Sequence, residues 1–305
     1  MGAVIDWKIV AKELASFLGA RVRISEPMSK HTTIGVGGPA RIMVLPQTSA
    51  EVARVVRYAL RRGVPYLPVG KGSNLIVRDA GYDGIVVQLA AHFTGVHLNQ
   101  RSVCAEGGAS FAALARRMTK LGRTGLEFAV GIPGSVGGAV RMNAGAFGGE
   151  VKDVLQRVRL VDGEGHFRSL RATDLEFSYR HTSLPARAIV VDATFSCVPG
   201  AIRTDVYERS VARKKTQPIW ERSFGSTFVN PPGRFAAEMI EGCGLKGRRQ
   251  GGAMFSDLHA NFIVNIDGHA TAADVEALIE IARDAVRARY GVDLKTEVIV
   301  IGNRG

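Results

Sequence analysis

A glycine-rich stretch at residues 131–149 has the composition of a loop that a ligand approaches closely. Glycine has no Cβ, so a backbone rich in it can come near another group. Successive exposed N–H groups in such a loop form a concavity that binds anions. The stretch therefore predicts a site for a diphosphate-bearing cofactor. The alternative is a buried glycine-rich loop that holds no ligand.

A second glycine loop, Gly70-Lys71-Gly72-Ser73-Asn74, follows an expected strand at residues 65–69. The spacing of its glycines differs from that of a Walker A loop, and the apolar residues 75–77 after it continue as a strand instead of a helix. Its N–H groups and the side chains of Ser73 and Asn74 can still bind phosphate. A simple β-turn is the alternative.

A partial dinucleotide-binding fingerprint occurs at Gly35, Gly37 and Ala40. We do not assign a Rossmann loop there, because polar residues precede it in place of a buried strand. In addition, no acidic residue closes a following strand at the expected distance.

Apolar periodicity and capping residues predict helices at residues 6–18, 49–62, 110–121, 203–216 and 270–290. Ser49 and Thr271 are the expected N-caps of the second and the last of these helices. Strands are expected at residues 41–45, 65–69, 75–77, 85–89, 103–106, 154–161 and 188–195. Both glycine loops are then expected in one α+β region that ends near a linker at Pro199-Gly200.

The chain has 305 residues, a net charge of +12 and three cysteines, Cys104, Cys197 and Cys243. The cysteines are odd in number and far apart, which argues against a disulfide framework or a zinc cluster. The histidines show no ligand spacing beyond His92 and His97, so we expect no metal. No apolar stretch approaches the roughly 20 residues of a membrane span, and no signal pattern begins the sequence. We therefore expect a cytoplasmic protein that does not bind a membrane.

The excess of Lys and Arg predicts attraction to polyanions such as nucleic acid, an acidic membrane surface or a phosphorylated small molecule. The basic residues are scattered along the chain, and the sequence has no basic stripe interleaved with aromatic residues. The scattered excess is therefore weak evidence for nucleic-acid binding. A basic nucleic-acid-binding protein without catalysis remains an alternative from another class.

Several motifs occur together in the order found in one enzyme family. They are Pro68–Leu75, Gly131–Gly138, Ser178-Tyr179-Arg180, Gly225-Ser226-Thr227-Phe228, Gly251-Gly252-Ala253 and Glu297-Val298. With these motifs the chain resembles UDP-N-acetylenolpyruvoylglucosamine reductase of bacterial cell-wall synthesis over nearly its whole length.

The resemblance implies an α+β fold in two parts. Residues 1–200 would form an FAD-binding region of the vanillyl-alcohol-oxidase type with two subdomains. Residues 201–305 would form an α+β substrate-binding domain, whose last strand can pack back on the FAD region. The short connection from Arg180 to Ser226 lacks the extra tyrosine-bearing loop of one subgroup and is similar to that of the compact subgroup. We expect a monomer.

The resemblance also implies the reaction. NADPH reduces FAD and leaves, and UDP-N-acetylglucosamine enolpyruvate takes its place, receives the hydride and becomes UDP-N-acetylmuramate. Hydride addition to the β-carbon of an enolpyruvyl ether puts negative charge on the α-carbon and its carboxylate. The site must stabilise that charge and donate one proton.

Three side chains match the catalytic residues of the family. Arg180 resembles the arginine that binds the carboxylate, with a surface salt bridge as the alternative. Ser226 resembles the proton donor to the α-carbon, although a Gly-Ser-Thr sequence by itself is more often a turn. Glu297 precedes an expected strand at 298–301 with apolar residues on both faces, and burial would keep its carboxyl protonated to hydrogen-bond the intermediate. The alternative is an exposed glutamate paired with Lys295.

The family motifs place FAD against both glycine loops and a following asparagine. The matching residues are Gly70, Lys71, Gly72, Ser73, Asn74, Leu75, Gly131, Ile132, Gly134, Ser135, Gly137, Gly138 and Asn143.

For the substrate, the candidates are Tyr179, Arg213, Lys215 and Asn230. The chain departs from the family pattern here, because Val229 stands where a lysine usually precedes the asparagine. A lysine often found just before the Pro218 region is also displaced, to Lys214 or Lys215. Arg213, Lys215 and Asn230 are therefore the candidates for the diphosphate of the substrate.

A different FAD-dependent oxidase or dehydrogenase on the same scaffold is the main alternative, because a fold does not fix the chemistry of its site. Rapid reoxidation of the reduced flavin by air, with no turnover of an enolpyruvyl nucleotide, would favour that alternative.

Overall fold

The computed structural model describes residues 5–304, apart from the side chains of Arg209, Ser210 and Lys214. The chain forms two compact units, each built from several segments. Unit 1 comprises Met1–Glu26, Arg41–Lys71 and Gly84–Val211, and unit 2 comprises Pro27–Ala40, Gly72–Asp83 and Ala212–Gly305. The chain thus passes between the units several times, and one passage lies within the second glycine loop, between Lys71 and Gly72.

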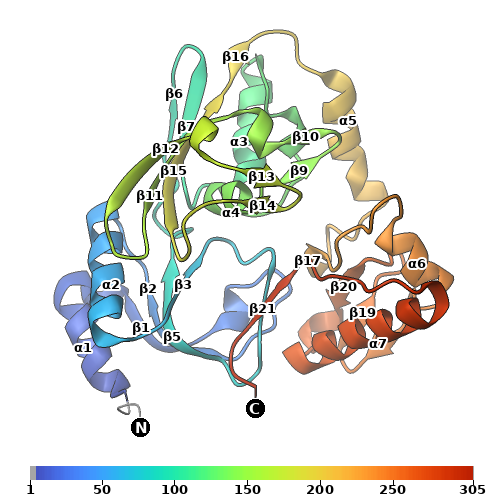
Figure 1. The fold of residues 1–305 in the computed structure, drawn as a ribbon, viewed down its shortest axis with the longest axis horizontal. Coiled ribbons are helices and arrows are strands. Elements are labelled where there is room, and N and C mark those ends of the chain that lie inside the picture. The colour runs from blue at the N-terminus through green and yellow to red at the C-terminus, as the bar shows by residue number, and fades with distance from the viewer. Residues whose placement is uncertain (1–4, 305) are drawn as a thin grey trace. The chain divides into compact units, whose positions relative to one another are not determined.

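One part of unit 1 is a four-stranded sheet covered by two helices (Figure 1). The strand order is β1 (Val22–Pro27), β2 (Pro39–Val44), β5 (Tyr82–Gln88) and β3 (Tyr66–Val69). The helices are α1 (Trp7–Leu18) and α2 (Ser49–Arg62), whose buried apolar residues join the strands in one core. Strands β3 and β5 run parallel, and β3 leads directly into the second glycine loop.

The other part of unit 1 is an antiparallel five-stranded sheet. Its order is β12 (Phe167–Arg171), β11 (Leu155–Val161), β15 (Ile189–Ser196), β7 (Ser102–Glu106) and β6 (Val96–Leu98). Helices α3 (Phe111–Lys120) and α4 (Val136–Arg141) share its core, in which Phe111 contacts Phe128 and Phe195.

Shorter elements complete unit 1. They are β8 (Arg123–Thr124) with β16 (Val198–Pro199), β9 (Gly145–Ala146) with β10 (Gly149–Glu150), β13 (Phe177–Ser178) with β14 (His181–Thr182), and α5 (Thr204–Ala212).

Unit 2 contains an antiparallel sheet in the order β17 (Arg222–Ser226), β20 (Phe262–Asn265), β19 (Ala253–Phe255) and β18 (Arg249–Gln250). Helices α6 (Ala236–Gly242) and α7 (Ala272–Tyr290) share the core of this unit. Strand β4 (Leu75–Val77), which follows the second glycine loop, pairs in parallel with the last strand, β21 (Ile299–Ile301).

Capping explains where the long helices begin. Thr271 and Asp274 form a capping box at the start of α7, as expected for Thr271, and the Asp79 carboxylate accepts from two further N–H groups there. At α2 the expected N-cap, Ser49, is wrong by one position, because the Thr48 hydroxyl accepts from the N–H of Glu51. Both residue types cap helices, so the sequence alone did not separate them.

Two further expectations differ from the structure. The helix expected at 203–216 ends at Ala212 and continues only as a 3-10 turn at Arg213–Lys215. On the last strand Val298 is buried but Ile299 is 47% exposed, so the expectation of a strand covered on both faces is wrong at Ile299.

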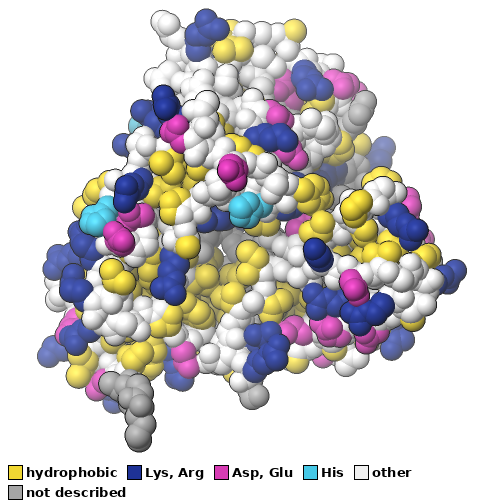
Figure 2. All heavy atoms as spheres, in the orientation of Figure 1, with side chains coloured by type: hydrophobic (Ala, Val, Ile, Leu, Met, Phe, Trp, Pro, Cys, Tyr) yellow, Lys and Arg dark blue, Asp and Glu magenta, His cyan; other side chains and the backbone are white. Residues whose placement is uncertain are grey.

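The surface is strongly basic but mixed in sign. Figure 2 shows Lys and Arg side chains at separate places, with Asp and Glu between them, on the face that is drawn. Within residues 5–304, none of the helices is both long and apolar enough to cross a lipid bilayer.

Candidate active site

The two glycine-rich stretches meet in unit 1. A Cβ added to Gly70 would lie only 2.0 Å from the Oγ atom of Ser135, so the backbone of one stretch touches the side chain of the other. Ser135 is 3% exposed and caps α4, where its hydroxyl accepts from the N–H of Gly138 at 3.4 Å. This close approach requires glycine at position 70. The two stretches are thus in contact at this point of unit 1.

The turn before α3 holds the long glycine run in place. Val136 donates its N–H to the Ala109 carbonyl and Gly137 donates to the Gly107 carbonyl, both at 2.8 Å. A Cβ on Gly107 or Gly108 would overlap neighbouring backbone oxygens. This turn was not predicted from the sequence, although the Gly107-Gly108 pair before a helix is a usable signal.

A pocket of about 340 Å³ opens beside this turn in unit 1. Lys71 and Arg117 are the cations among its lining residues, which include Thr94, Ser110 and Leu114. The predicted residue Lys71 is therefore next to a cavity that can hold an anionic group. Arg117, on the exposed side of α3, was not predicted.

In unit 2 the structure brings Ser226 and Glu297 onto adjacent segments. Ser226 ends β17, and the carbonyl of the next residue, Thr227, accepts from the Glu297 N–H at 2.9 Å. One step further, Val229 donates to the Lys295 carbonyl at 2.9 Å. The two candidate catalytic residues of this unit are therefore held in one short antiparallel frame.

The second glycine loop joins the same frame through Asn74. Its side-chain amide donates to the Glu297 carbonyl at 3.0 Å, and its own carbonyl accepts from the N–H of Ile299 at 3.1 Å. Gly72 is fixed by its φ of +61° and by the His31 carbonyl, which a Cβ at this position would approach to 2.0 Å. The loop end that follows Lys71 thus lies beside Glu297.

Two other segments of unit 2 support this arrangement. The buried side chain of Asn261 donates to the Phe228 carbonyl and accepts from the Phe228 N–H, at 2.8 and 2.9 Å. Thr33 donates its hydroxyl to the Ser223 carbonyl at 2.6 Å and its N–H to the Gly72 carbonyl at 3.1 Å. The segment around Thr33, which we did not assign as a Rossmann loop, leads into β2, and its bond to Ser223 stabilises β17.

Arg180 belongs to unit 1, where it lies at the turn of the β13–β14 hairpin. Its φ is +57°, and its guanidinium carbon is 4.7 Å from the centre of the Tyr179 ring. Tyr179 is 50% exposed and Arg180 is partly buried. Both side chains are thus at least partly exposed to solvent. Ser226 and Glu297 belong to unit 2 and are also partly buried.

The candidates for the substrate's diphosphate lie in unit 2. Arg213 donates from Nε to the Gln217 side chain at 2.9 Å, and Lys215 is exposed. The Asn230 side chain accepts from the N–H of Ala236 at the start of α6. Lys214 has a side chain outside the described part of the chain. Burial lowers the pKa of the nearby His259, and the charge of Arg213 lowers it further.

Comparison with known proteins identifies the family. The model of the UDP-N-acetylenolpyruvoylglucosamine reductase C-terminal domain matches residues 217–301, and the model of an FAD binding domain matches residues 40–171. A UDP-N-acetylenolpyruvoylglucosamine reductase from Heliobacterium modesticaldum is 44% identical over 92% of this chain and 90% of its own length. One from Geobacillus kaustophilus is 43% identical over 96% of this chain and 97% of its own length.

The chain belongs to the UDP-N-acetylenolpyruvoylglucosamine reductase family. The crystal structure of the reductase from Thermus caldophilus agrees, with a TM-score of 0.79 and 34% identity over 92% of this chain and 97% of that one. The chain is thus an FAD-containing oxidoreductase of peptidoglycan synthesis, and the expected fold class is confirmed.

The two domain models divide the predicted residues of this reductase. Both glycine stretches lie within the FAD-binding match, and Ser226, Asn230 and Glu297 lie within the C-terminal match. Tyr179, Arg180, Arg213 and Lys215 lie between the two matches.

Buried polar atoms test whether the residues suit FAD. Among the residues that the structure describes, Gln88 Oε1 and Thr227 Oγ1 are the buried side-chain oxygens without a hydrogen-bond partner. Gln88 lies opposite Val69, the residue before Gly70, and Thr227 follows Ser226. Buried polar groups are normally bonded, so a bound ligand or water would satisfy each atom. In unit 1, Gln88, Gly70 and the pocket at Lys71 together fit a polar cofactor with an anionic group.

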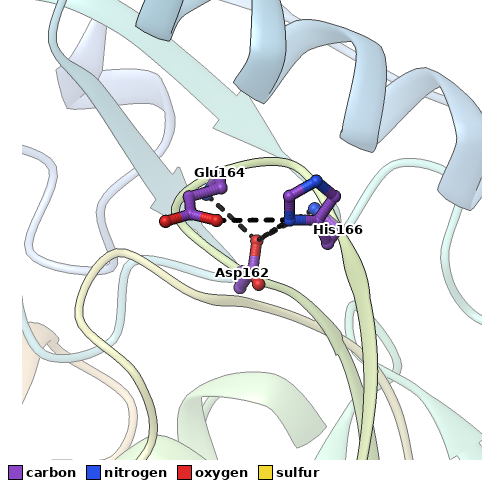
Figure 3. A group of neighbouring side chains, drawn as sticks. All are labelled: Asp162, Glu164 and His166. Atoms are coloured by element: carbon purple, nitrogen blue, oxygen red, sulfur yellow. Dashed lines mark hydrogen bonds and ion pairs between the residues drawn. The ribbon is translucent and has the colours of Figure 1, made fainter.

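A cluster of Asp162, Glu164 and His166 in the β11–β12 turn has the residue types of a metal site (Figure 3). The Asp162 carboxylate accepts from the backbone N–H groups of Glu164 and His166 and from the Arg168 side chain, all at 2.9 to 3.0 Å. These bonds use both carboxylate oxygens and are typical of a side chain that stabilises a turn. The cluster thus has a structural explanation without a metal.

Proposed function

We propose that this chain catalyses the NADPH-dependent reduction of UDP-N-acetylglucosamine enolpyruvate to UDP-N-acetylmuramate, with FAD as the bound carrier of the hydride. The observation that supports the proposal most is the frame in unit 2, where Glu297 donates to the carbonyl next to Ser226 and Asn74 holds the Glu297 carbonyl. This frame presents a hydroxyl and a carboxyl, the groups that proton delivery to a carbanion requires. The substrate follows from the names of the relatives.

FAD, when bound, would take the hydride of NADPH and supply it to the β-carbon of the enolpyruvyl group. The chain's own residues would manage the charge that results. Arg180 would bind the substrate carboxylate, where a fixed guanidinium is worth about 2–4 kcal/mol of transition-state stabilisation in a site that excludes water.

Ser226 would donate its hydroxyl proton to the α-carbon, which completes the reduction of the carbon–carbon double bond. A serine hydroxyl is a weak acid, so this role depends on a strongly basic carbanion and on fixed geometry. Glu297 would stay protonated and donate a hydrogen bond to the intermediate. The bonds that its backbone makes to Thr227 and Asn74 fix its position beside Ser226.

The cofactor would be held by both glycine stretches. The residues proposed for this are Gly70, Lys71, Gly72, Ser73, Asn74, Leu75, Gly131, Ile132, Gly134, Ser135, Gly137, Gly138 and Asn143, to which the pocket adds Arg117.

The substrate would be held by Tyr179, Arg213, Lys215 and Asn230, the last three against its diphosphate. Arginine and lysine bind phosphate by charge-assisted hydrogen bonds, so Arg213 and Lys215 are stronger candidates for the diphosphate than the neutral Asn230. We further propose that the enzyme works as a monomer in the cytoplasm, which sedimentation and fractionation would test.

A two-step anaerobic titration tests the proposed function. The purified protein should be yellow with a flavin spectrum, NADPH should bleach it, and the enolpyruvyl nucleotide should restore the colour and yield the lactyl ether. A protein that cannot be loaded with FAD would contradict the proposal. So would reduced flavin that air reoxidises rapidly while the enolpyruvyl nucleotide has no effect.

Ser226→Ala separates the two steps. The rate of flavin reduction by NADPH should stay within about twofold of wild type. The rate of flavin reoxidation by the enolpyruvyl nucleotide should fall about 10²–10⁴-fold, the range for loss of a general acid. Ser223→Ala, on the same strand, is the matched control and should keep both rates. Equal loss of both steps in Ser226→Ala would argue against a role in proton donation.

A further inference from the structure

The hairpin that carries Arg180 is too small to hold its own shape. β13 and β14 pair through Phe177 with Thr182 and Ser178 with His181, and the turn between them is Tyr179-Arg180. Beyond these pairs, Glu176 and Ser183 exchange two hydrogen bonds at the open end. At φ +57° Arg180 is in the left-handed region, which costs a non-glycine residue about 1–2 kcal/mol. An isolated two-stranded hairpin is marginal in water, so other contacts must stabilise this conformation.

Two hydrogen bonds tie the hairpin to the end of α4. The Thr182 hydroxyl donates to the Val140 carbonyl at 2.6 Å, and the Asn143 side chain donates to the Ser178 carbonyl at 3.1 Å. Thr182 is 1% exposed and Asn143 is fully buried. One bond holds each strand of the hairpin, on either side of Arg180.

Asn143 is itself fixed by the loop that follows α4. Its amide also donates to Glu150, and its carbonyl oxygen accepts from the Lys152 N–H at 3.0 Å. Burial would raise the pKa of Glu150, but hydrogen bonds from Lys152 and Asn143 and the charge of Arg180 lower it overall. Glu150 is therefore an anion whose charge acts on Arg180 from the same cluster. The Asn143 side chain is thus engaged within unit 1, and these bonds do not test its predicted contact with FAD.

The same short helix connects this cluster to the glycine contact. Ser135 caps the N-terminus of α4 and touches Gly70, whereas Val140 and Asn143 lie at its C-terminal end. Interactions at the two ends of α4 thus fix both the glycine run and the hairpin within unit 1.

We propose that Thr182 and Asn143 are positioning residues that hold Arg180 in the conformation that binds the substrate carboxylate. The inference rests on the proposed role of Arg180 and assigns to two further residues a part in the second half-reaction. It follows that loss of the Thr182 bond affects the enolpyruvyl nucleotide and spares the reaction with NADPH.

Thr182→Val and Thr182→Ser test the first bond. Valine has the shape of threonine without the donor, and serine keeps the donor. A misplacement of about 1 Å can cost 10²-fold in rate, so Thr182→Val should slow flavin reoxidation by the nucleotide about 10–100-fold. Flavin reduction by NADPH should stay within about twofold, and Thr182→Ser should recover most of the lost rate. The control is Thr119→Val, which removes a hydroxyl bonded to the Ala115 carbonyl in α3 and should keep both rates.

A double-mutant cycle shows whether Thr182 acts through Arg180. Once Arg180→Ala has removed the guanidinium, adding Thr182→Val should cost nothing more in reoxidation rate. Additive losses would overturn the positioning role and leave the role of Arg180 intact. An Arg180→Ala enzyme that reoxidises at the wild-type rate would overturn the role of Arg180 itself.

Asn143→Asp provides an independent test, which also serves if Thr182→Val does not fold. Aspartate keeps the acceptor for the Lys152 N–H but has no N–H to donate to Ser178, and it adds a charge beside Glu150. Because Asn143 is also proposed to hold FAD, both rates are measured per bound flavin, and reoxidation by the nucleotide should fall about tenfold more than flavin reduction by NADPH. Full reoxidation per bound flavin in Asn143→Asp, or an equal fall in both rates, would contradict the proposal.

Discussion

The N–H of Glu297 donates to the carbonyl of Thr227 at 2.9 Å, which places a carboxyl-bearing residue on the segment next to Ser226. Glu297 is only partly buried, and its own carbonyl accepts from the Asn74 side chain. These backbone bonds fix the position of the Glu297 Cα on the segment beside Ser226.

Glu297→Gln should separate the half-reactions. Glutamine keeps the backbone bonds and the size of the side chain, but its amide is a far weaker acid than a carboxyl and donates a weaker hydrogen bond to the intermediate. Flavin reduction by NADPH, which does not use that bond, should persist. Reoxidation by the enolpyruvyl nucleotide should fall about 10²–10⁴-fold, measured by anaerobic stopped-flow absorbance. Glu280→Gln, an exposed residue of α7 paired with Arg283, is the control. Equal loss in both half-reactions would count against the assignment.

Gly70→Ala should disturb the contact between the glycine stretches. The new Cβ would lie 2.0 Å from Ser135 Oγ and 2.8 Å from its Cβ, and overpacking of this kind costs about 1–3 kcal/mol. We expect a lower melting temperature and less bound FAD, measured by thermal denaturation and flavin absorbance. Gly138→Ala, whose Cβ would keep an ordinary 3.5 Å from Ser135 Oγ, should not lose stability.

A second substitution makes that prediction specific. Ser135→Gly removes both atoms that Gly70→Ala would strike, and glycine in place of serine at an N-cap costs only about a few tenths of a kcal/mol. The double variant should therefore recover most of the stability lost by Gly70→Ala. If it melts no higher than the single variant, the contact does not explain the loss.

Local sequence signals predicted most of the long elements of the fold. The expected helices at 49–62 and 270–290 correspond to α2 and α7, because caps and apolar periodicity act within a few residues. The pairing of β4 with β21, at opposite ends of the sequence, has no local signal. The division of the glycine loop between two units, at Lys71 and Gly72, depends on such long-range pairing and could not be predicted.

The candidate site shows the same limit. Ser226 and Glu297 were chosen by motif, and their adjacency depends on a backbone bond between distant segments that no motif encodes. The support from Asn261 and Thr182 comes from side chains that bond to backbone carbonyls far away in the sequence. Such residues look like ordinary polar positions until the fold shows what they reach.

Stability should depend on acid through Glu51. Paired hydrogen bonds from Arg21 lower the pKa of Glu51 from 4.5 to about 2. Because the folded-state value is depressed, the stabilisation is complete above pH ~4.5 and is lost as pH falls toward 2, and it amounts to about 2–3 kcal/mol. Urea unfolding between pH 7 and 2.5 gives the free energy of unfolding of wild type and of Glu51→Gln. The difference between the two should shrink as the pH falls through that range. If the free energies of unfolding of the two proteins fell in parallel with pH, that result would contradict this linkage. The control is Glu164→Gln, at an exposed position.

The orphaned oxygen of Gln88 predicts opposite effects on the protein with and without FAD. A buried acceptor without a partner costs about 1–3 kcal/mol, so Gln88→Met should raise the melting temperature of the FAD-free protein. If a group on FAD donates to this oxygen, the same change weakens FAD binding and reduces the rise in melting temperature that FAD produces. Gln156→Met, at an exposed position of β11, should change neither quantity. If a bond from FAD to this oxygen contributes to binding, its loss must reduce the rise in melting temperature that FAD produces. The same rise in Gln88→Met and in wild type would therefore mean that Gln88 does not contact the cofactor.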